Sequence, residues 1–279
     1  MINISMDTIT SLLLGIIQGL TEFLPISSSG HLVLFQNLFG LREPVLLFDT
    51  SLHMGTLVAV CVYFRSDLKQ MIVETFQFVI DLTKGRRNLK EIHDVPHVSL
   101  ALWVLIGTIP TALIGLSFRL SLEKLFGSLF WVGIMLIFTG LILAVTRIIP
   151  TGYTNRRGVG LLAALAIGTA QGLALIPGIS RSGATIVCGM LFKIKRDLAA
   201  RFSFLLSIPA IIGALVLQLN VEGLNNIGIL PLVIGFVSSI LVGLLSLKIL
   251  MGMVRKGNLY YFAPYCWAVG LFVLTLRSF

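Results

Sequence analysis

The sequence predicts an all-α polytopic membrane protein: six transmembrane helices plus two re-entrant helical hairpins in an inverted-topology repeat. Apolar residues make up 56% of the 279-residue chain and charged residues only 12%, and the mean hydropathy is +0.98. A water-soluble domain carries roughly 25% charged residues, so most of this surface must face lipid. The apolar runs approach the ~20 residues that cross a bilayer as a helix and lack the alternation typical of an outer-membrane barrel.

Two apolar stretches, at 6–40 and 158–192, are interrupted at their centres by PISSSG and PGISRSG. Glycine, proline and serine break a helix into halves that are too short to cross a membrane. Broken backbone is tolerated at membrane depth only where protein or water surrounds it, so each stretch is expected to be a re-entrant hairpin. The uninterrupted runs are predicted to be full spans, at 45–64, 98–117, 129–146, 202–219, 229–247 and 260–276.

The basic residues support this layout. Segments 65–97, 147–157, 193–201 and 248–257 hold six, three, four and three Lys or Arg, together sixteen of the 21 in the chain. With six spans and two hairpins, all four segments lie on one side, which the positive-inside rule makes cytoplasmic, so both termini are expected outside. No Lys or Arg precedes Arg42, so the first apolar stretch lacks the basic region of a cleavable signal peptide.

The two interrupted stretches repeat one another. GIIQGLTEFLPISSSG at 15–30 aligns without gaps on GTAQGLALIPGISRSG at 168–183, with eight identities in sixteen positions. Each copy precedes three spans, and because three is odd the second half must be inverted. We therefore predict a first repeat over 1–150 and an inverted second repeat over 151–279 in one membrane domain, with both hairpin tips near the midplane.

Two charged residues lie deep within these stretches, where insertion costs about 2.5–3.5 kcal/mol at the bilayer centre. Glu22 follows Gln18 by four residues, which places both side chains on one helix face, and Arg181 lies within the second break. One interpretation is a buried Glu–Arg pair that only stabilises the fold. That interpretation leaves the neighbouring hydroxyls unexplained.

Hydroxyl residues occupy both breaks: Ser27, Ser28 and Ser29 in the first, and Ser180, Ser182 and Thr185 in the second. A helix N-terminus exposes free N–H groups and favours an anion, and a guanidinium matches phosphate oxygens in a bidentate way. We therefore predict an oxyanion site where the two hairpin tips meet Arg181. The alternative is that these residues only cap helices or permit close packing.

Histidines also lie in the apolar regions. His31 directly follows the first break, where a neutral imidazole could act as general base or acid, or simply be a hydrogen-bonded packing residue. Asp49 and His53 are four residues apart and can pair on one helix face, and we interpret that pair as structural.

The motifs QGLTEFLPISSSGH at 18–31 and PGISRSGATI at 177–186 resemble the two signature motifs of the undecaprenyl-diphosphate phosphatase family, the bacitracin-resistance type. RFSFLLSIP at 201–209 resembles the stretch that follows the second motif, and the resemblance covers essentially the whole chain. It implies a bacterial plasma-membrane enzyme that hydrolyses undecaprenyl diphosphate to undecaprenyl phosphate and inorganic phosphate, and thereby recycles the lipid carrier of peptidoglycan synthesis and confers bacitracin resistance.

The resemblance also implies site roles. Ser28 is the nucleophile in one mechanism, with His31 as its base, and direct attack by water activated by His31 or Glu22 is the alternative. Glu22 and Arg181 are the further catalytic residues. Substrate binding falls to Gln18, Ser27, Ser29, Ser180, Ser182 and Thr185. Because Gln18 is an amide, only Glu22 remains as a carboxylate ligand for Mg²⁺ or Ca²⁺, which the substrate's phosphates would bridge.

The implied partners are a polyprenyl diphosphate lipid and the surrounding membrane lipids. The net charge of +9 is explained by loop orientation and not by nucleic acid. Glycine-rich helix faces could mediate a homodimer or internal packing. Because inverted repeats are typical of transporters, a secondary transporter or lipid-phosphate flippase is the competing function.

Overall fold

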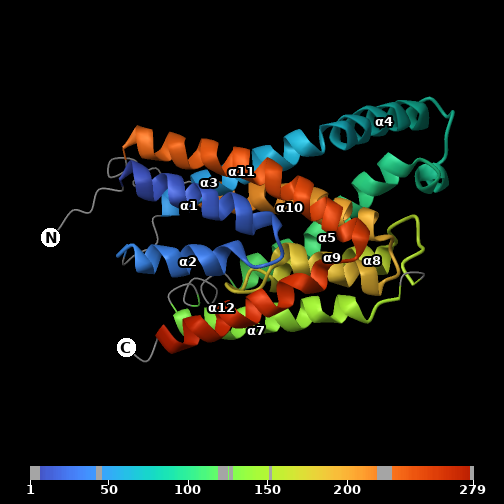
Figure 1. Cartoon of the computed structure of the whole chain (residues 1–279). Coiled ribbons are helices and arrows are strands. Elements are labelled where there is room, and N and C mark those ends of the chain that lie inside the picture. Colours follow the sequence, from blue (N-terminus) through green and yellow to red (C-terminus); the bar gives the residue numbers. More distant parts are fainter. Residues whose placement is uncertain are drawn as a thin grey trace.

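The computed structural model describes residues 7–41, 46–118, 125, 128–150, 153–218 and 228–276. Apart from one isolated bridge between Arg156 and Ile194, the regular structure within these ranges is helical. The helices are α1 (Thr8–Phe23), α2 (Ser28–Leu38), α3 (Leu46–Tyr63), α4 (Arg65–Thr83), η1 (Leu89–His93), α5 (Pro96–Ser117), α7 (Leu129–Ala144), η2 (Val145–Arg147), α8 (Leu161–Leu173), α9 (Arg181–Leu191), α10 (Arg196–Gln218), α11 (Ile229–Lys256), η4 (Leu259–Phe262) and α12 (Ala263–Leu276) (Figure 1).

Five helical segments in the described ranges are long and apolar enough to cross a bilayer: Pro96–Ser117, Leu129–Arg147, Arg196–Leu217, Ile229–Lys256 and Leu259–Leu276. A sixth crossing arises if α3 and α4, which are bent by 72° at Phe64, count as one span. Five of the six expected runs fall on these five segments, and the sixth, 45–64, falls on α3. Helices α1 and α8 are apolar but shorter, as expected for the interrupted stretches.

Two predicted boundaries are wrong. Helix α10 begins at Arg196 and not near residue 202, and α11 continues to Lys256 and not to residue 247. Charged residues such as Lys and Arg end an apolar run, but they are good helix formers, so the helix continues past the apolar segment. α11 then stops at Gly257, whose φ of 77° gives the left-handed conformation of a common C-cap.

The two interrupted stretches fold as similar helix–turn–helix hairpins, α1–α2 and α8–α9. Helix α1 ends before Pro25, because a proline disfavours helical backbone in the residue before it. Ser27 then caps α2 by accepting a hydrogen bond from the Gly30 amide at 3.3 Å. The aligned Ser180 caps α9 by accepting from the Gly183 amide at 3.1 Å. The aligned serines therefore make the same capping hydrogen bond, although their backbones differ: φ is 70° at Ser27 and −78° at Ser180.

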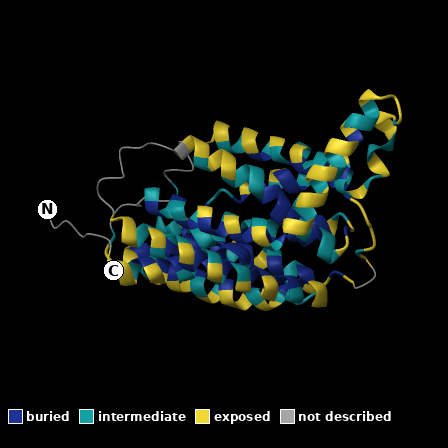
Figure 2. Ribbon diagram, turned by 90° about the horizontal axis from the view of Figure 1, so that it is seen from above, coloured by how far each residue is buried: buried dark blue, intermediate teal, exposed yellow. Residues whose placement is uncertain are grey.

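Each hairpin packs against the other half of the chain: α1 lies along α11, and α8 lies along α5. Glycines permit both approaches. A Cβ on Gly15 would overlap Ser238 Oγ, and a Cβ on the aligned Gly168 would overlap the Gly107 carbonyl oxygen. Buried residues concentrate where the helices meet, and exposed residues cover the outside (Figure 2).

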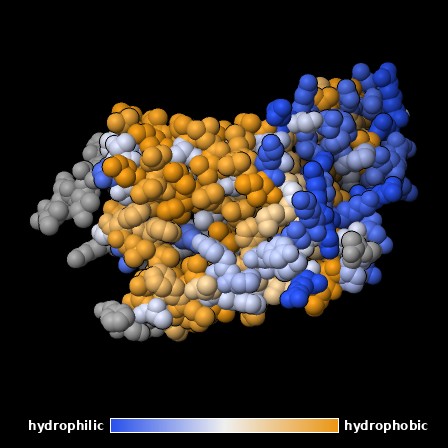
Figure 3. Space-filling view, viewed as in Figure 1, coloured by the Kyte–Doolittle hydropathy of each residue, from blue (hydrophilic) through white to orange (hydrophobic). Residues whose placement is uncertain are grey.

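The four basic segments gather at one end of the molecule, as predicted. The space-filling view shows an apolar body with hydrophilic residues at the end that carries α4 (Figure 3). Three contacts join the segments there: Arg201 Nη1 to Asp67 Oδ1 at 2.6 Å, Arg255 Nε to Asp197 Oδ1 at 2.7 Å, and the Arg156 amide to the Lys193 carbonyl at 2.9 Å. Helix α1 begins and α12 ends at the opposite end (Figure 1).

Candidate functional site

The tips of the two hairpins are in contact. Glu22, in the last turn of α1, accepts a hydrogen bond at Oε1 from Arg181 Nη2 of α9 at 2.5 Å. A Cβ on Gly30 would lie 3.3 Å from the Cα of Gly178, so the backbones of the tips themselves approach closely. Residues 159 positions apart in the sequence thus form one polar cluster.

Glu22 is the centre of this cluster. Its Oε2 accepts hydrogen bonds from Ser28 Oγ at 2.6 Å and from Gln18 Nε2 at 3.1 Å, and His53 Nδ1 lies 3.6 Å from the same oxygen. The glutamate is buried, and a buried carboxylate is tolerated only when it is paired and hydrogen-bonded. Arg181, Ser28 and Gln18 meet that requirement from three directions.

Arg181 is the first residue of α9, and its side chain is 15% exposed. Only Nη2 binds Glu22, while Nη1 is buried without a hydrogen-bond partner in the described part of the chain. A buried donor without a partner costs about 1–3 kcal/mol, and more when it is charged. An unpaired guanidinium N–H beside two helix N-termini is suited to a phosphate oxygen.

The predicted hydroxyls lie in pairs, one pair at each hairpin tip. Ser27 Oγ lies 3.3 Å from Ser29 Oγ, and the aligned Ser180 Oγ lies 3.3 Å from Ser182 Oγ. The first amides of α2 and α9 have no acceptor within their own helices. Ser27 has φ of 70°, an unfavourable conformation for a non-glycine residue that is often found at functional sites.

Thr185 lies one turn further along α9 and is fully buried. Its Oγ1 lies 2.7 Å from the Arg181 carbonyl oxygen, to which it can donate. The same Oγ1 lies 2.5 Å from Ser203 Oγ, and either hydroxyl can be the donor of that hydrogen bond. The hydroxyl therefore connects the first turn of α9 to α10. Its contacts place it behind Arg181, where it supports the backbone of that residue.

His31 binds residues other than the predicted Ser28. Its Nδ1 lies 2.8 Å from the Ser27 carbonyl oxygen, which only accepts, so Nδ1 carries the proton. Nε2 of the neutral ring then accepts from the Tyr265 hydroxyl at 2.9 Å. Ser28 instead donates to Glu22. The structure thus brings Ser28 to Glu22 and His31 to Tyr265, and the catalytic role of His31 stays a prediction.

The predicted pairing of Asp49 with His53 is wrong. Asp49 Oδ1 accepts from Gln36 Nε2 of α2 at 2.6 Å, and His53 Nδ1 lies 3.0 Å from Gln18 Nε2 of α1. The spacing allowed the pair, but amides on two neighbouring helices offer each side chain a closer partner. His53 thereby belongs to the cluster around Glu22.

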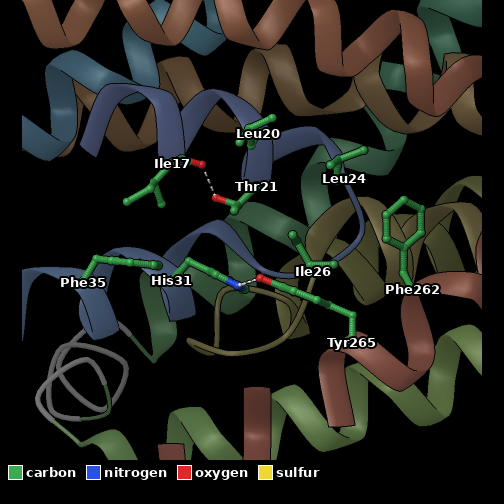
Figure 4. Close-up of a pocket in the computed structure, with 9 residues that line it drawn as sticks. All are labelled: Ile17, Leu20, Thr21, Leu24, Ile26, His31, Phe35, Phe262 and Tyr265. Atoms are coloured by element: carbon green, nitrogen blue, oxygen red, sulfur yellow. Dashed lines mark hydrogen bonds between the residues drawn. The ribbon is translucent and has the colours of Figure 1, made fainter. Parts of the chain in front are cut away.

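An apolar cavity of about 360 Å³ lies between the first hairpin and the segment from η4 to the start of α12 (Figure 4). It is lined by Ile17, Leu20, Thr21, Leu24, Ile26, His31, Phe35, Phe262 and Tyr265. The four α1 residues at positions 17, 20, 21 and 24 form one helix face, and Gln18 and Glu22 lie on the adjacent face. His31 and Tyr265 meet at the cavity wall, so the cavity and the polar cluster share the first hairpin.

Sequence reasoning did not identify Tyr265, Ser203 or Thr139. Thr139 of α7 accepts from the Ser180 amide at 3.0 Å and donates to the Gly178 carbonyl at 2.8 Å, which fixes the second tip. Each of the three is a hydroxyl within an apolar span, and Ser203 also belongs to RFSFLLSIP at 201–209. Because spans tolerate many such hydroxyls, their partners come only from the structure.

The described residues do not fit a resident metal ion. They contain no group of three or more His, Cys, Asp and Glu side chains that could hold one. Both oxygens of Glu22 already accept hydrogen bonds, from Arg181 on one side and from Ser28 and Gln18 on the other. A guanidinium at that distance also competes directly with a cation for the carboxylate.

Apolar helices of spanning length and two broken helices that meet at a buried Glu–Arg pair define the class: a multi-pass membrane protein with a polar site between its helices. Residues 11–272 match the family described as bacitracin resistance protein BacA. The match covers most of the chain, and the chain belongs to this family.

Several relatives share nearly full-length similarity. The undecaprenyl-diphosphatase of Desulfatibacillum aliphaticivorans is 46% identical over 265 residues, which is 94% of this chain and 96% of the relative. That of Desulfosudis oleivorans is 47% identical over 267 residues, covering 95% and 97%. That of the archaeon Methanosphaera stadtmanae is 42% identical over 272 residues, covering 97% and 98%.

Proposed function

We propose that this protein is an undecaprenyl-diphosphate phosphatase, which hydrolyses the lipid diphosphate to undecaprenyl phosphate and inorganic phosphate. The relatives named above carry this activity in their names, and the family is the bacitracin-resistance type. The product is the lipid carrier of peptidoglycan synthesis, so the enzyme recycles that carrier. Removal of the diphosphate also accounts for bacitracin resistance.

One observation carries the proposal: the unpaired Nη1 of Arg181, next to the amino ends of α2 and α9. The diphosphate would accept from this N–H, from the free amides of the two helix N-termini and from the hydroxyls of Ser27, Ser29, Ser180 and Ser182. These groups are fixed before substrate arrives, so they stabilise charge that develops on the transferring phosphoryl group. Thr185 holds Arg181 in place from behind.

For the chemical step, Ser28 is the proposed nucleophile. Its hydroxyl already donates to Glu22 at 2.6 Å, which makes Glu22 the acceptor best placed to take its proton. His31 has a free acceptor at Nε2 once the Tyr265 hydroxyl turns away, and it is the proposed proton donor or acceptor on the opposite side of the tip. In the alternative mechanism, water attacks the phosphorus directly with Glu22 and His31 as the proton-transfer groups. Ser28 variants distinguish the two mechanisms.

The apolar cavity is the proposed site of the first part of the polyprenyl chain. Its volume lies at the low end of the roughly 300–1,000 Å³ of small-molecule sites, so most of a long chain would lie in the surrounding lipid. Tyr265 is 44% exposed, which indicates that the cavity opens sideways between α1 and α12. The diphosphate would reach the tips while the chain stays in an apolar environment.

The proposed membrane arrangement has six spans and two re-entrant hairpins in an inverted repeat. The reciprocal packing of α1 on α11 and α8 on α5 supports the inversion, and the identical capping of α2 and α9 supports the repeat. The basic end is assigned to the cytoplasm of a bacterial plasma membrane, with both termini outside. A divalent cation, if required, would arrive bound to the substrate's phosphates, because Glu22 is already engaged.

The test is release of inorganic phosphate from undecaprenyl or farnesyl diphosphate by the purified protein in detergent. Steady turnover by the wild type, with a much lower kcat/KM in a folded Arg181→Ala variant, is the expected result. A secondary transporter or flippase would release no phosphate. That outcome would refute the proposed function.

A further inference from the structure

The amide of Gln18 lies between acceptors on two different helices. Its Nε2 is 3.1 Å from Glu22 Oε2 of α1 and 3.0 Å from His53 Nδ1 of α3. Gln18 is fully buried. Its Oε1 has no hydrogen-bond partner among the residues that the structure describes. The chemistry proposed above gives neither this oxygen nor His53 a role.

The two neighbours fix the orientation of the amide. An ionised carboxylate only accepts, so the amide atom that faces Glu22 must be the nitrogen. The same nitrogen donates to His53 Nδ1, which places the proton of the neutral ring on Nε2. Amide oxygen and nitrogen are assigned from their partners. Glu22 fixes this assignment, and the role of His53 Nδ1 as an acceptor follows from it. Oε1 therefore lies on the side of the amide away from Glu22 and His53.

We propose that Gln18 Oε1 accepts a hydrogen bond from the water that supplies oxygen during phosphate release, and that His53 is a positioning residue that holds the amide in this orientation. This inference rests on the proposed phosphatase function. A buried acceptor without a donor costs about 1–3 kcal/mol, and ordered water commonly satisfies such atoms. Glutamine orients the attacking water in other phosphoryl-transfer enzymes.

The water oxygen forms a bond to the terminal phosphorus while that phosphorus loses its bond to the leaving oxygen. The leaving oxygen is the bridging oxygen of the lipid diphosphate or, after a phosphoserine has formed, Oγ of Ser28. One water proton stays on the released phosphate, and the other passes through a non-bridging phosphate oxygen to the leaving oxygen. Gln18 keeps its protons and only orients the water.

The experiment compares His53→Asn with His53→Leu in the full-length protein, using phosphate release from farnesyl diphosphate. The Asn side-chain oxygen can replace Nδ1 as an acceptor, whereas Leu offers none. Because a misplaced reacting group costs on the order of 100-fold, we expect Leu to lower kcat by roughly 10- to 100-fold with little change in KM. Asn should keep kcat within a few-fold of wild type. Met54→Leu, the exposed neighbour on α3, is the matched control.

Wild-type kcat in His53→Leu would overturn the proposal, as would equal losses of kcat in both His53 variants. If His53→Leu does not fold, as thermal unfolding in detergent would reveal, Gln18 supplies the second comparison. Gln18→Leu removes the acceptor oxygen and should lower kcat by roughly 10- to 100-fold with little change in KM, whereas Met54→Leu should not. Full activity of Gln18→Leu contradicts the proposal. Absence of phosphate release by the wild type would instead refute the proposed function itself.

Discussion

Replacement of Arg181 by alanine removes the group on which substrate recognition depends. The variant loses the hydrogen bond from Nη2 to Glu22 and the unpaired Nη1 that we assign to a phosphate oxygen. Hydrogen bonds to charged groups are worth about 1.5–3 kcal/mol each. Only the Nη1 contact is made with substrate, so its loss lowers kcat/KM by roughly 10- to 100-fold at 1.36 kcal/mol per decade. The bond from Nη2 to Glu22 lies within the protein, and its loss affects stability.

The same substitution leaves the buried Glu22 without its cation, which costs about 3–5 kcal/mol when a buried pair is broken. Folding must therefore be measured separately, by thermal unfolding and gel filtration in detergent. Arg181→Lys keeps the charge but not the two-pronged geometry, and we expect it to fold and to show an intermediate loss of kcat/KM. A second variant, Arg181→Ala with Glu22→Gln, removes both charges.

Arg201→Ala is the matched control, because it removes an arginine that binds Asp67 at the basic end, away from the tips. That pair is partly exposed and worth little to stability, so phosphate release should stay near wild type. A folded Arg181→Ala protein with wild-type kcat/KM would refute the assignment of the site. Equal losses in the Arg181 and Arg201 variants would do the same, since they would indicate a general effect of removing an arginine.

Three further substitutions test other parts of the account with the same phosphate-release assay. Ser28→Ala should lower kcat by at least roughly 100-fold if Ser28 is the nucleophile, and substantial residual turnover would favour direct attack by water. His31→Ala should lose roughly 10²- to 10⁴-fold of the rate, and added imidazole should restore part of it if the ring transfers a proton; no rescue would favour a packing role. Leu20→Trp should fill the cavity and raise KM for farnesyl diphosphate by roughly tenfold, since each buried CH₂ is worth about 0.8 kcal/mol, while hydrolysis of inorganic pyrophosphate stays unchanged. An equal effect on both substrates would contradict the proposal that the cavity binds the polyprenyl chain.

Much of the architecture was predictable because it depends on local rules. Proline, glycine and serine at the centre of an apolar stretch break a helix wherever they occur, so both hairpins could be placed from PISSSG and PGISRSG. Glu22 and Arg181 could be identified because charge inside an apolar stretch requires a reason. Their contact followed from the repeat, which predicted that the two tips converge.

Side-chain partners were less predictable, because they depend on how distant helices pack. Asp49 and His53 have the spacing of a helical pair, yet each binds an amide from another helix. Ser28 and His31 are neighbours in sequence, yet Ser28 turns to Glu22 and His31 to Tyr265. Tyr265 is 234 positions from His31, and no local pattern relates them. A helix face can be read from spacing, but the element that covers it cannot.

The central claim is that the two hairpin tips form a single site, and a double-mutant cycle between Glu22 and Arg181 tests it most directly. kcat/KM for phosphate release from farnesyl diphosphate would be measured for wild type, Glu22→Gln, Arg181→Ala and the double variant. If the residues act together, the double variant should be little worse than Arg181→Ala alone. Losses that multiply across the two substitutions would mean that the tips work independently, which would contradict the account.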